Sequence, residues 1–387
     1  MKKYACIFYS CFVLASIASA GELVTAHYRI ITEPGAENIA GTLSWELELR
    51  FDAYNRLFRF DPSTLTEPLN VRVFIDRNAY DSYVSARTSQ SSGGAIYLHY
   101  NQKDRRELVI CRFSREEAAM LPHQAFIQFL RGFIANPPAW MREGFSIYFN
   151  TLKFDPAEGR LNYTENLAWL EEVKLTRQTT GPIRSLITAD LSFSAYPENF
   201  QIQSWAFVSF LLNSGNEEYF RTLIECFMLL SPAASAADNS YAVMKHMDLW
   251  AGFDAMEKDY QLYLDSRKTF NELMEEGRNA YNTGDAFSAE LSFLAALAGM
   301  PTHYAPYYYL GLIYYAENNY SLADEYYRLS LSYGADEALV SYALGLNAAS
   351  AGNNEEAVQW LRRSSAADPV RYRERADELI RRLQSLP

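Results

Sequence analysis

Cysteine is scarce in this chain of 387 residues, which contains only four. Cys6 and Cys11 lie in an apolar N-terminal segment, and the other two are Cys111 and Cys226. Two cysteines do not make a disulfide framework, so an apolar core has to hold the fold. Hydrophobic residues make up 49% of the chain and aromatic residues 15%, which suffices for such a core. Whether Cys111 pairs with Cys226 does not follow from their spacing.

Positive charge is also in deficit, with 35 Lys and Arg against 47 Asp and Glu and a formal net charge of −12. This balance argues against nucleic acid and anionic membrane surfaces as partners. The sequence contains no G-x-S-x-G, no P-loop and no dinucleotide-binding glycine fingerprint. Cys111 lies in a predicted strand without a paired histidine in sequence reach, so we do not expect a cysteine nucleophile.

Long apolar runs are missing except at the N-terminus. There, Lys2 and Lys3 precede an apolar run over residues 4–17, and Ala18-Ser19-Ala20 follows it. This pattern is typical of a secretory signal peptide, so we expect cleavage before Gly21 and export to the periplasm or cell envelope. Retention of residues 1–20 as an anchor is the alternative. No later stretch is apolar enough to span a bilayer, so we expect no transmembrane span in the mature chain.

One of the five histidines lies in a broken metal-binding motif, Leu121-Pro122-His123-Gln124-Ala125-Phe126-Ile127. In the zinc-peptidase pattern H-E-x-x-H, two imidazoles one helical turn apart bind zinc and the glutamate is the general base. Here Gln124 replaces the glutamate and Ile127 replaces the second histidine. A carboxamide has no basic site near neutral pH and isoleucine has no lone pair, so the base and one ligand are both missing.

The next segment, residues 138–149, has the sequence P-A-W-M-R-E-G-F-S-I-Y-F. The histidine helix followed by P-x-W-x-x-E-G-x-x-x-Y-F resembles the peptidase-MA-like family of gluzincin-type metalloproteases. Later helices predicted at residues 203–212 and 256–264 extend the resemblance over most of residues 23–264. It implies that Glu143 corresponds to the third zinc ligand. It also implies that the strand near residues 95–100 pairs with an extended substrate.

His123 and Glu143 would provide two protein ligands, whereas catalytic zinc generally has three and a water molecule. His99 or Glu117 would have to move in to complete the set, and neither has the i+4 geometry of the lost histidine. We therefore expect no catalytic residues and no zinc cofactor. The residues that remain of the motif have a structural explanation, because they can pack the cleft and hold the start of a helix.

The order of predicted elements indicates an α+β fold in which a gluzincin-like mixed sheet and a helical part form one domain over residues 21–265. Strands are predicted at residues 23–31, 71–75, 95–100 and 107–111. Helices are predicted at residues 36–60, 116–133 and 141–150, and residues 76–80 are predicted to start a short helix.

The C-terminal third contains an internal repeat. Small residues recur every 34 positions, at Gly277, Gly311 and Gly345 and at Ala289, Ala323 and Ala357. Large residues follow four positions after each alanine, at Phe293, Tyr327 and Leu361. A period of 34 is that of tetratricopeptide repeats, and the sequence resembles three of them at residues 270–303, 304–337 and 338–371. An amphipathic capping helix is predicted at residues 372–386, so residues 266–387 are expected to form an all-α solenoid.

Tetratricopeptide-repeat arrays bind a peptide or a partner protein along a concave groove lined by the first helix of each repeat. In that register the candidate binding residues are Arg278, Tyr281, Tyr308, Tyr315 and Tyr342. The alternative is that these aromatic side chains only pack between helices.

Three functions are compatible with these patterns. The first is a peptidase-like pseudoenzyme that acts as an exported peptide- or protein-binding scaffold. The second is an active zinc metallopeptidase with a non-standard ligand set. The third is a purely structural role in an envelope assembly.

Overall fold

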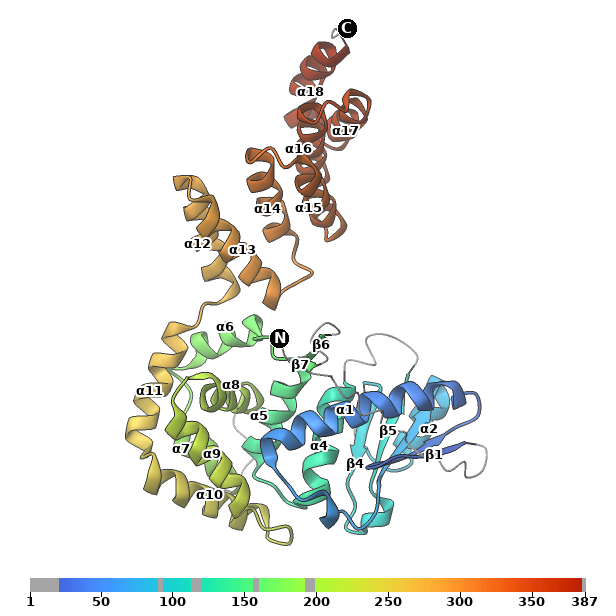
Figure 1. Ribbon diagram of the computed structural model, residues 1–387, viewed down its shortest axis with the longest axis vertical. Coiled ribbons are helices and arrows are strands. Elements are labelled where there is room, and N and C mark those ends of the chain that lie inside the picture. Colours follow the sequence, from blue (N-terminus) through green and yellow to red (C-terminus); the bar gives the residue numbers. More distant parts are fainter. Residues whose placement is uncertain (1–20, 90–92, 113–119, 156–159, 192–198, 385–387) are drawn as a thin grey trace, which may run out of the picture. The chain divides into compact units, whose positions relative to one another are not determined.

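The computed structural model describes residues 21–89, 93–112, 120–155, 160–191 and 199–384. These residues are mostly helical, with a five-stranded mixed sheet in the N-terminal part, which confirms the α+β class. The chain divides into two compact units (Figure 1). The first contains residues up to Tyr163 together with Thr176–Leu264, and the second contains Thr164–Leu175 and the residues from Asp265 onward.

The sheet of the first unit has the strand order β1-β2-β3-β5-β4. The three central strands are parallel to one another, and each edge strand is antiparallel to its neighbour. Strand β4 therefore has one neighbour only. The strands are β1 (Glu22–Val24), β2 (Tyr28–Thr32), β3 (Leu69–Phe74), β4 (Ala95–Leu98) and β5 (Glu107–Cys111).

The single strand predicted at residues 23–31 is wrong, because a turn divides it into β1 and β2. The backbone N–H of Thr25 donates to the carbonyl of Tyr28 at 2.9 Å. The carboxylate of Glu48 accepts from the Thr25 hydroxyl at 2.6 Å and from the His27 N–H at 2.9 Å. The bonds to Glu48 fix the turn, and this partner lies in α1, outside the stretch whose alternation predicted one strand.

Helices α1 (Ala40–Phe58) and α4 (Leu121–Phe133) pack against each other and against the sheet (Figure 1). Their aromatic rings meet edge to face: Phe51 lies 5.1 Å from Phe129, and Tyr54 lies 5.2 Å from Phe126. A short 3-10 helix, Glu37–Ile39, precedes α1, so the helix predicted over residues 36–60 is shorter and begins with a different turn.

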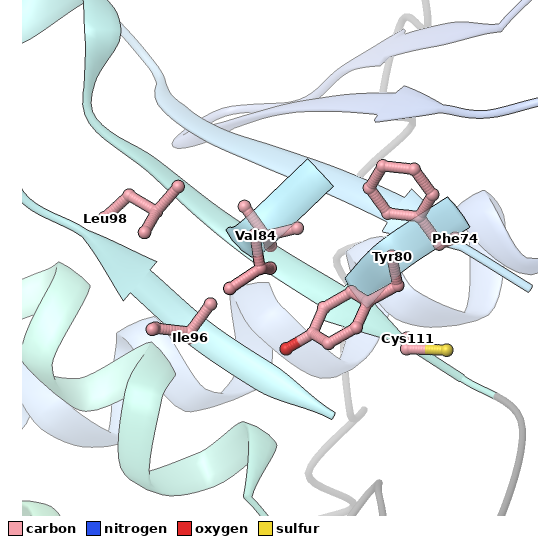
Figure 2. Close-up of a cluster of buried hydrophobic side chains, with 7 residues drawn as sticks. Phe74, Tyr80, Val84, Ile96, Leu98 and Cys111 are labelled. Carbon is pink, nitrogen blue, oxygen red and sulfur yellow. The ribbon is translucent and has the colours of Figure 1, made fainter. Parts of the chain in front are cut away.

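Helix α2 (Arg77–Ser85) covers the other face of the sheet, and Asp76 caps its start by accepting from the Ala79 N–H at 2.7 Å. Its buried Tyr80 and Val84 pack on alternate residues of β3, β4 and β5, as Figure 2 shows. Because side chains alternate along strands, the intervening buried residues point to the face of α1 and α4. The cluster under α2 consists of Phe74, Tyr80, Val84, Ile96, Leu98, Val109 and Cys111.

The rest of the first unit is mainly helical. Helices α5 and α8 approach closely because Gly144 has no side chain: a Cβ there would lie 2.8 Å from Val208 Cγ2 and closer still to the Ser204 carbonyl. The remaining elements are α5 (Ala139–Asn150), β6 (Lys153–Asp155), β7 (Arg160–Asn162), α7 (Ile183–Ile187), α8 (Phe200–Asn213), α9 (Glu217–Leu229), α10 (Ala236–Trp250) and α11 (Phe253–Ser266), with 3-10 turns at Pro62–Thr64, Lys103–Arg105 and Ala189–Leu191.

The second unit consists of successive antiparallel helices. A Cβ on each recurring glycine would collide with the large residue of the paired helix, at 2.6 Å for Gly277 and Phe293 and at 2.5 Å for Gly311 and Tyr327. This packing is compatible with the predicted repeat solenoid. The helices are α12 (Phe270–Thr283), α13 (Ala286–Gly299), α14 (Tyr304–Ala316), α15 (Tyr320–Ser332), α16 (Glu337–Ser350), α17 (Asn354–Ala367) and α18 (Pro369–Gln384).

The last helix, α18, begins at Pro369 rather than at residue 372, because proline fits the first turn of a helix, where its missing N–H is not needed. It buries one apolar face, made of Tyr372, Ala376, Ile380 and Leu383. Its remaining surface is mostly charged, although Val370 in the first turn is exposed as well.

Helix α6 (Leu167–Thr176) is the main departure from the expected domain boundaries, because it groups with the second unit instead of residues 21–265. The ammonium group of Lys174 contacts the carboxylate of Glu272 at 2.8 Å, and Leu167 lies where a side chain on Gly299 would be. None of the helices in the described ranges has the length and apolar composition needed to cross a membrane.

Candidate functional site

The predicted site residues His123, Gln124 and Ile127 lie in the first two turns of α4. Pro122 occupies the first turn of this helix, where proline is tolerated. His123, Gln124 and Ile127 are half-buried, whereas Ala125 and Phe126 point into the core between α1 and α4. The residues of the broken motif therefore line one accessible face of α4.

Gln124 is bound to the edge strand. Its side-chain oxygen accepts a hydrogen bond from the backbone N–H of Tyr97 in β4 at 2.9 Å. This N–H points away from the neighbouring strand β5, toward the side on which an added strand would pair. The resemblance assigned substrate pairing to this strand, and in the structure the Gln124 carboxamide occupies one of its donors.

Glu143, the expected third ligand, comes from α5 and has partners at both carboxylate oxygens. Its Oε1 accepts from Arg142 Nε at 2.9 Å, and its Oε2 accepts from Gln201 Nε2 of α8 at 3.0 Å. The Glu143 side chain is 12% exposed, so these bonds form in a partly desolvated environment. Both bonds hold the carboxylate in place, and the Arg142 guanidinium offsets its charge.

Burial and charge keep the histidines of this region neutral. Burial lowers the pKa of His123, and the effects of Glu143, which raises it, and of Arg142, which lowers it, oppose each other. The pKa of His99, which follows β4, falls to about 4 because of burial and the nearby charges of Arg131, Arg106 and Arg142. His99 Nδ1 is buried without a hydrogen-bond partner in the described part of the chain.

Arginines make the site positively charged. Burial lowers the pKa of Arg131, as do the neighbouring guanidinium groups of Arg142 and Arg106. Among the described residues, the charged groups that act on these histidines are the guanidinium groups of Arg106, Arg131 and Arg142 and the carboxylate of Glu143. Metal ligation requires neutral or anionic donors, and nearby positive charge repels the metal ion. The three guanidinium groups therefore disfavour a bound cation at this site.

Arg131, Arg142 and Gln201 are not among the site residues predicted from the sequence. Arg131 follows His123 by eight positions on one helix, and Arg142 is adjacent to Glu143. Their spacing from the motif residues could therefore have predicted that both lie near the site. Gln201 gave no signal, because it reaches Glu143 only when α5 and α8 pack together. Glu117, the other residue considered as a rescuing ligand, lies outside the described residues.

The described residues include no group of three or more His, Cys, Asp or Glu side chains that is arranged to hold a metal ion. No disulfide joins Cys111 to Cys226, and both are buried. Cys226 lies in an apolar environment that raises the pKa of its thiol to about 12, so a reactive thiolate is disfavoured at neutral pH.

The candidate binding residues of the repeats lie in the second unit, and four of the five contact other repeat residues. The rings of Tyr281 and Tyr309 are 6.1 Å apart, and Tyr342 lies 5.2 Å from Tyr372 of the last helix. Tyr308 and Tyr315 pack on the core around Tyr327 and Leu344. Arg278 is exposed. The tyrosines therefore contribute to packing between helices, and Arg278 is the candidate with the freest surface.

Comparison with known proteins gives no match, either to a protein-family model or to a curated protein. The resemblance to peptidase-MA-like proteins therefore rests on the motif residues and their positions. What the site can do has to follow from its own chemistry.

Proposed function

We propose that this protein is an exported peptidase-like pseudoenzyme whose helical repeats bind a peptide or protein partner in the periplasm or cell envelope. The relationship to peptidase-MA-like proteins, the signal peptide at residues 1–20 and the tetratricopeptide assignment are parts of this proposal. They rest on the residues described above for each of them.

The observation that carries the proposal is the bond between Gln124 and Tyr97. A general base needs a free lone pair that is directed toward a water molecule. The Gln124 oxygen instead accepts from a backbone N–H, and a carboxamide oxygen is not basic near neutral pH. Gln124, at the position of the base, thus joins α4 to β4, and this role involves no catalytic chemistry.

The donor set does not fit a catalytic zinc ion. His123 and Glu143 are the two candidate ligands, and Glu143 is already neutralised by Arg142. A zinc ion would have to displace that guanidinium and remain close to Arg131.

For the repeats, Arg278 and Tyr281 lie three positions apart on α12, and both residues are at least partly exposed. Such a pair is suited to a peptide that carries a carboxylate and an apolar side chain. We expect the partner to contact this end of the array, since the other tyrosines are engaged in packing.

The first test is the metal content of the purified chain, Gly21–Pro387, by elemental analysis after dialysis against excess zinc and then against buffer. We expect far less than one zinc per chain in folded protein. About one zinc per chain, lost in His123→Ala and in Glu143→Ala, would contradict the proposal and support the metallopeptidase alternative.

The second test addresses binding. Proteins captured from envelope extracts on the full chain are compared with those captured on Arg278→Glu and on a control, Arg375→Glu, which reverses an exposed charge on α18. We expect a partner that is lost with Arg278→Glu only. Identical captured sets on all three would favour the purely structural role.

A further inference from the structure

Arg131, near the end of α4, forms no hydrogen bond, ion pair or ring contact with any residue that the structure describes. It is half-buried, so part of the residue remains open to solvent. The other two arginines of the candidate site have partners. Arg142 Nε lies 2.9 Å from Glu143 Oε1, and Arg106 Nε donates to the Tyr100 carbonyl at 2.7 Å. The planar N–H groups of Arg131 are therefore available to a ligand.

The position of Arg131 on α4 brings it beside the edge strand. It follows Ile127 by four positions and Gln124 by seven, so the three residues share one face of the helix. Helix α4 packs against β4 (Figure 1), and Gln124 accepts from the Tyr97 N–H on this side. Tyr97 and Arg106 both act on the charge of Arg131. All of these residues belong to the first unit, so a ligand here would not depend on the repeats.

The charges around Arg131 do not balance. Burial lowers the pKa of Arg131, and the guanidinium groups of Arg142 and Arg106 lower it further, whereas Tyr97 and Glu143 raise it. Three guanidinium groups and one carboxylate leave an excess of positive charge. A partly buried cation without a counter-ion in contact is unfavourable, because its lost hydration is not replaced. A bound anion would replace it.

We propose that Arg131 binds the carboxylate group of a ligand through two parallel N–H···O bonds. The edge of a guanidinium group matches a carboxylate in this geometry, and the charge on both groups strengthens the bonds. Both donors belong to one rigid planar group, so the pairing does not require two side chains to converge on one acceptor.

The number of free donors favours a carboxylate over a phosphate group. One guanidinium edge satisfies both oxygens of a carboxylate, whereas a phosphate group has further strong acceptor oxygens. Arg106 and Arg142 already donate to Tyr100 and Glu143. The carboxylate belongs either to a small carboxylic acid or to the C-terminus of a peptide.

Three variants separate a direct contact from general charge. Arg131→Gln removes both the charge and the planar donors, and Arg131→Lys keeps the charge alone. Arg56→Gln removes a positive charge at an exposed position of α1. Because Arg131 forms no hydrogen bond in the folded chain and is repelled by its neighbours, Arg131→Gln should leave the thermal stability of the ligand-free protein unchanged or higher.

The experiment is a chemical-shift titration of the full purified chain. The probes are N-acetyl-trialanine with a free C-terminus, the same peptide with a C-terminal amide, sodium acetate and sodium phosphate. Backbone amide signals of α4 give the affinities. The Arg131 Nε–H signal, identified by its loss in Arg131→Gln, reports the contact itself.

We expect saturable binding of the free-acid peptide that shifts the Arg131 Nε–H signal, with affinity at least about tenfold higher than for the amide and higher than for phosphate. The affinity should fall about tenfold in Arg131→Gln, fall less in Arg131→Lys and stay unchanged in Arg56→Gln. Acetate that binds as tightly as the free-acid peptide would identify a small acid as the source, whereas a tighter peptide would identify a C-terminus.

Several results would overturn the proposal. One is the absence of saturable binding by the free-acid peptide and acetate, and another is equal affinity for the acid and the amide or for the wild type and Arg131→Gln. Tighter binding of phosphate would show that the group is not a carboxylate. A clear loss of thermal stability in ligand-free Arg131→Gln would show that the guanidinium supports the fold instead of a ligand.

Discussion

The side-chain oxygen of Gln124 accepts a hydrogen bond from the backbone N–H of Tyr97 at 2.9 Å, joining the start of α4 to the edge strand β4. The bond spans 27 positions of the sequence and lies in a partly buried environment. Gln124, which stands where the H-E-x-x-H pattern has its general base, thus joins α4 to β4. The family resemblance implies that this same strand would pair with an extended substrate.

The first prediction concerns this bond. Gln124→Ala leaves the Tyr97 N–H without its acceptor and should lower the free energy of unfolding by about 1 kcal/mol. Gln124→Glu keeps an acceptor oxygen for the Tyr97 N–H, so its stability should stay close to that of the wild type. Urea unfolding of the three proteins at pH 7 measures both effects. Equal stability of Gln124→Ala and the wild type would mean that solvent replaces the bond at no cost.

The second prediction concerns zinc. Ile127→His adds an imidazole one turn from His123 and should raise zinc affinity at least about tenfold over the wild type. Adding Arg142→Gln removes a positive charge and frees Glu143 Oε1, so the double variant should bind zinc more tightly than Ile127→His alone.

Competition with a chromogenic zinc chelator at pH 7.5 measures these affinities. Leu262→His, at an exposed position of α11, controls for the addition of a histidine to any surface. If the single and double variants bind zinc equally, Arg142 does not control the charge of the site.

The third prediction concerns acid. The pKa of His99 is about 4 in the folded chain and about 6.5 in a model peptide. Between these values the unfolded chain binds a proton that the folded chain does not, so this residue lowers the stability of the folded state as pH falls from 6.5 to 4. Because His99 is only half-buried, we expect its contribution to be about 1–3 kcal/mol.

The measurement is urea unfolding of the full chain, as wild type and as His99→Gln, at pH 7, 5.5 and 4.5. Other titrating groups act equally in both proteins and cancel in the difference. The wild type should lose more stability than the variant on acidification. A difference that stays constant with pH would show that His99 is protonated as readily in the folded chain as in the unfolded one.

The repeat region shows what local sequence can predict. The contact between Gly311 and Tyr327 involves two residues 16 positions apart within one helical pair, and a glycine and a large apolar or aromatic residue recur at these places in every period. A contact of this kind repeats in the sequence itself, so the helix pairs follow from the period of 34. The predicted start of α18 at residue 372 is three residues late, because the period of 34 does not reveal that Pro369 forms the first turn of the helix.

The candidate site shows what local sequence cannot predict. His123, Gln124, Ile127 and Glu143 were identified from a motif, but their partners come from other elements. Gln201 reaches Glu143 from α8, and the bond from Tyr97 to Gln124 depends on how α4 lies against β4. The grouping of α6 with the second unit likewise rests on ion pairs such as that of Lys174 with Glu272, whose partners are 98 positions apart.

The fourth prediction compares one substitution at two glycines in helices of the first unit. In Gly144→Ala, the new methyl group would overlap the Ser204 carbonyl and lie 2.8 Å from Val208 Cγ2, and a backbone carbonyl in a packed helix cannot move freely. Helices α5 and α8 would have to separate, so we expect a loss of about 3 kcal/mol in the free energy of unfolding.

In Gly41→Ala, at the start of α1, nothing lies within 4 Å of the new methyl group. There the higher helix propensity of alanine should stabilise the protein by about 0.5 kcal/mol. Thermal and urea unfolding of both variants checks the opposite signs, and a Gly144→Ala protein as stable as the wild type would mean that the contact between α5 and α8 is looser than these distances require.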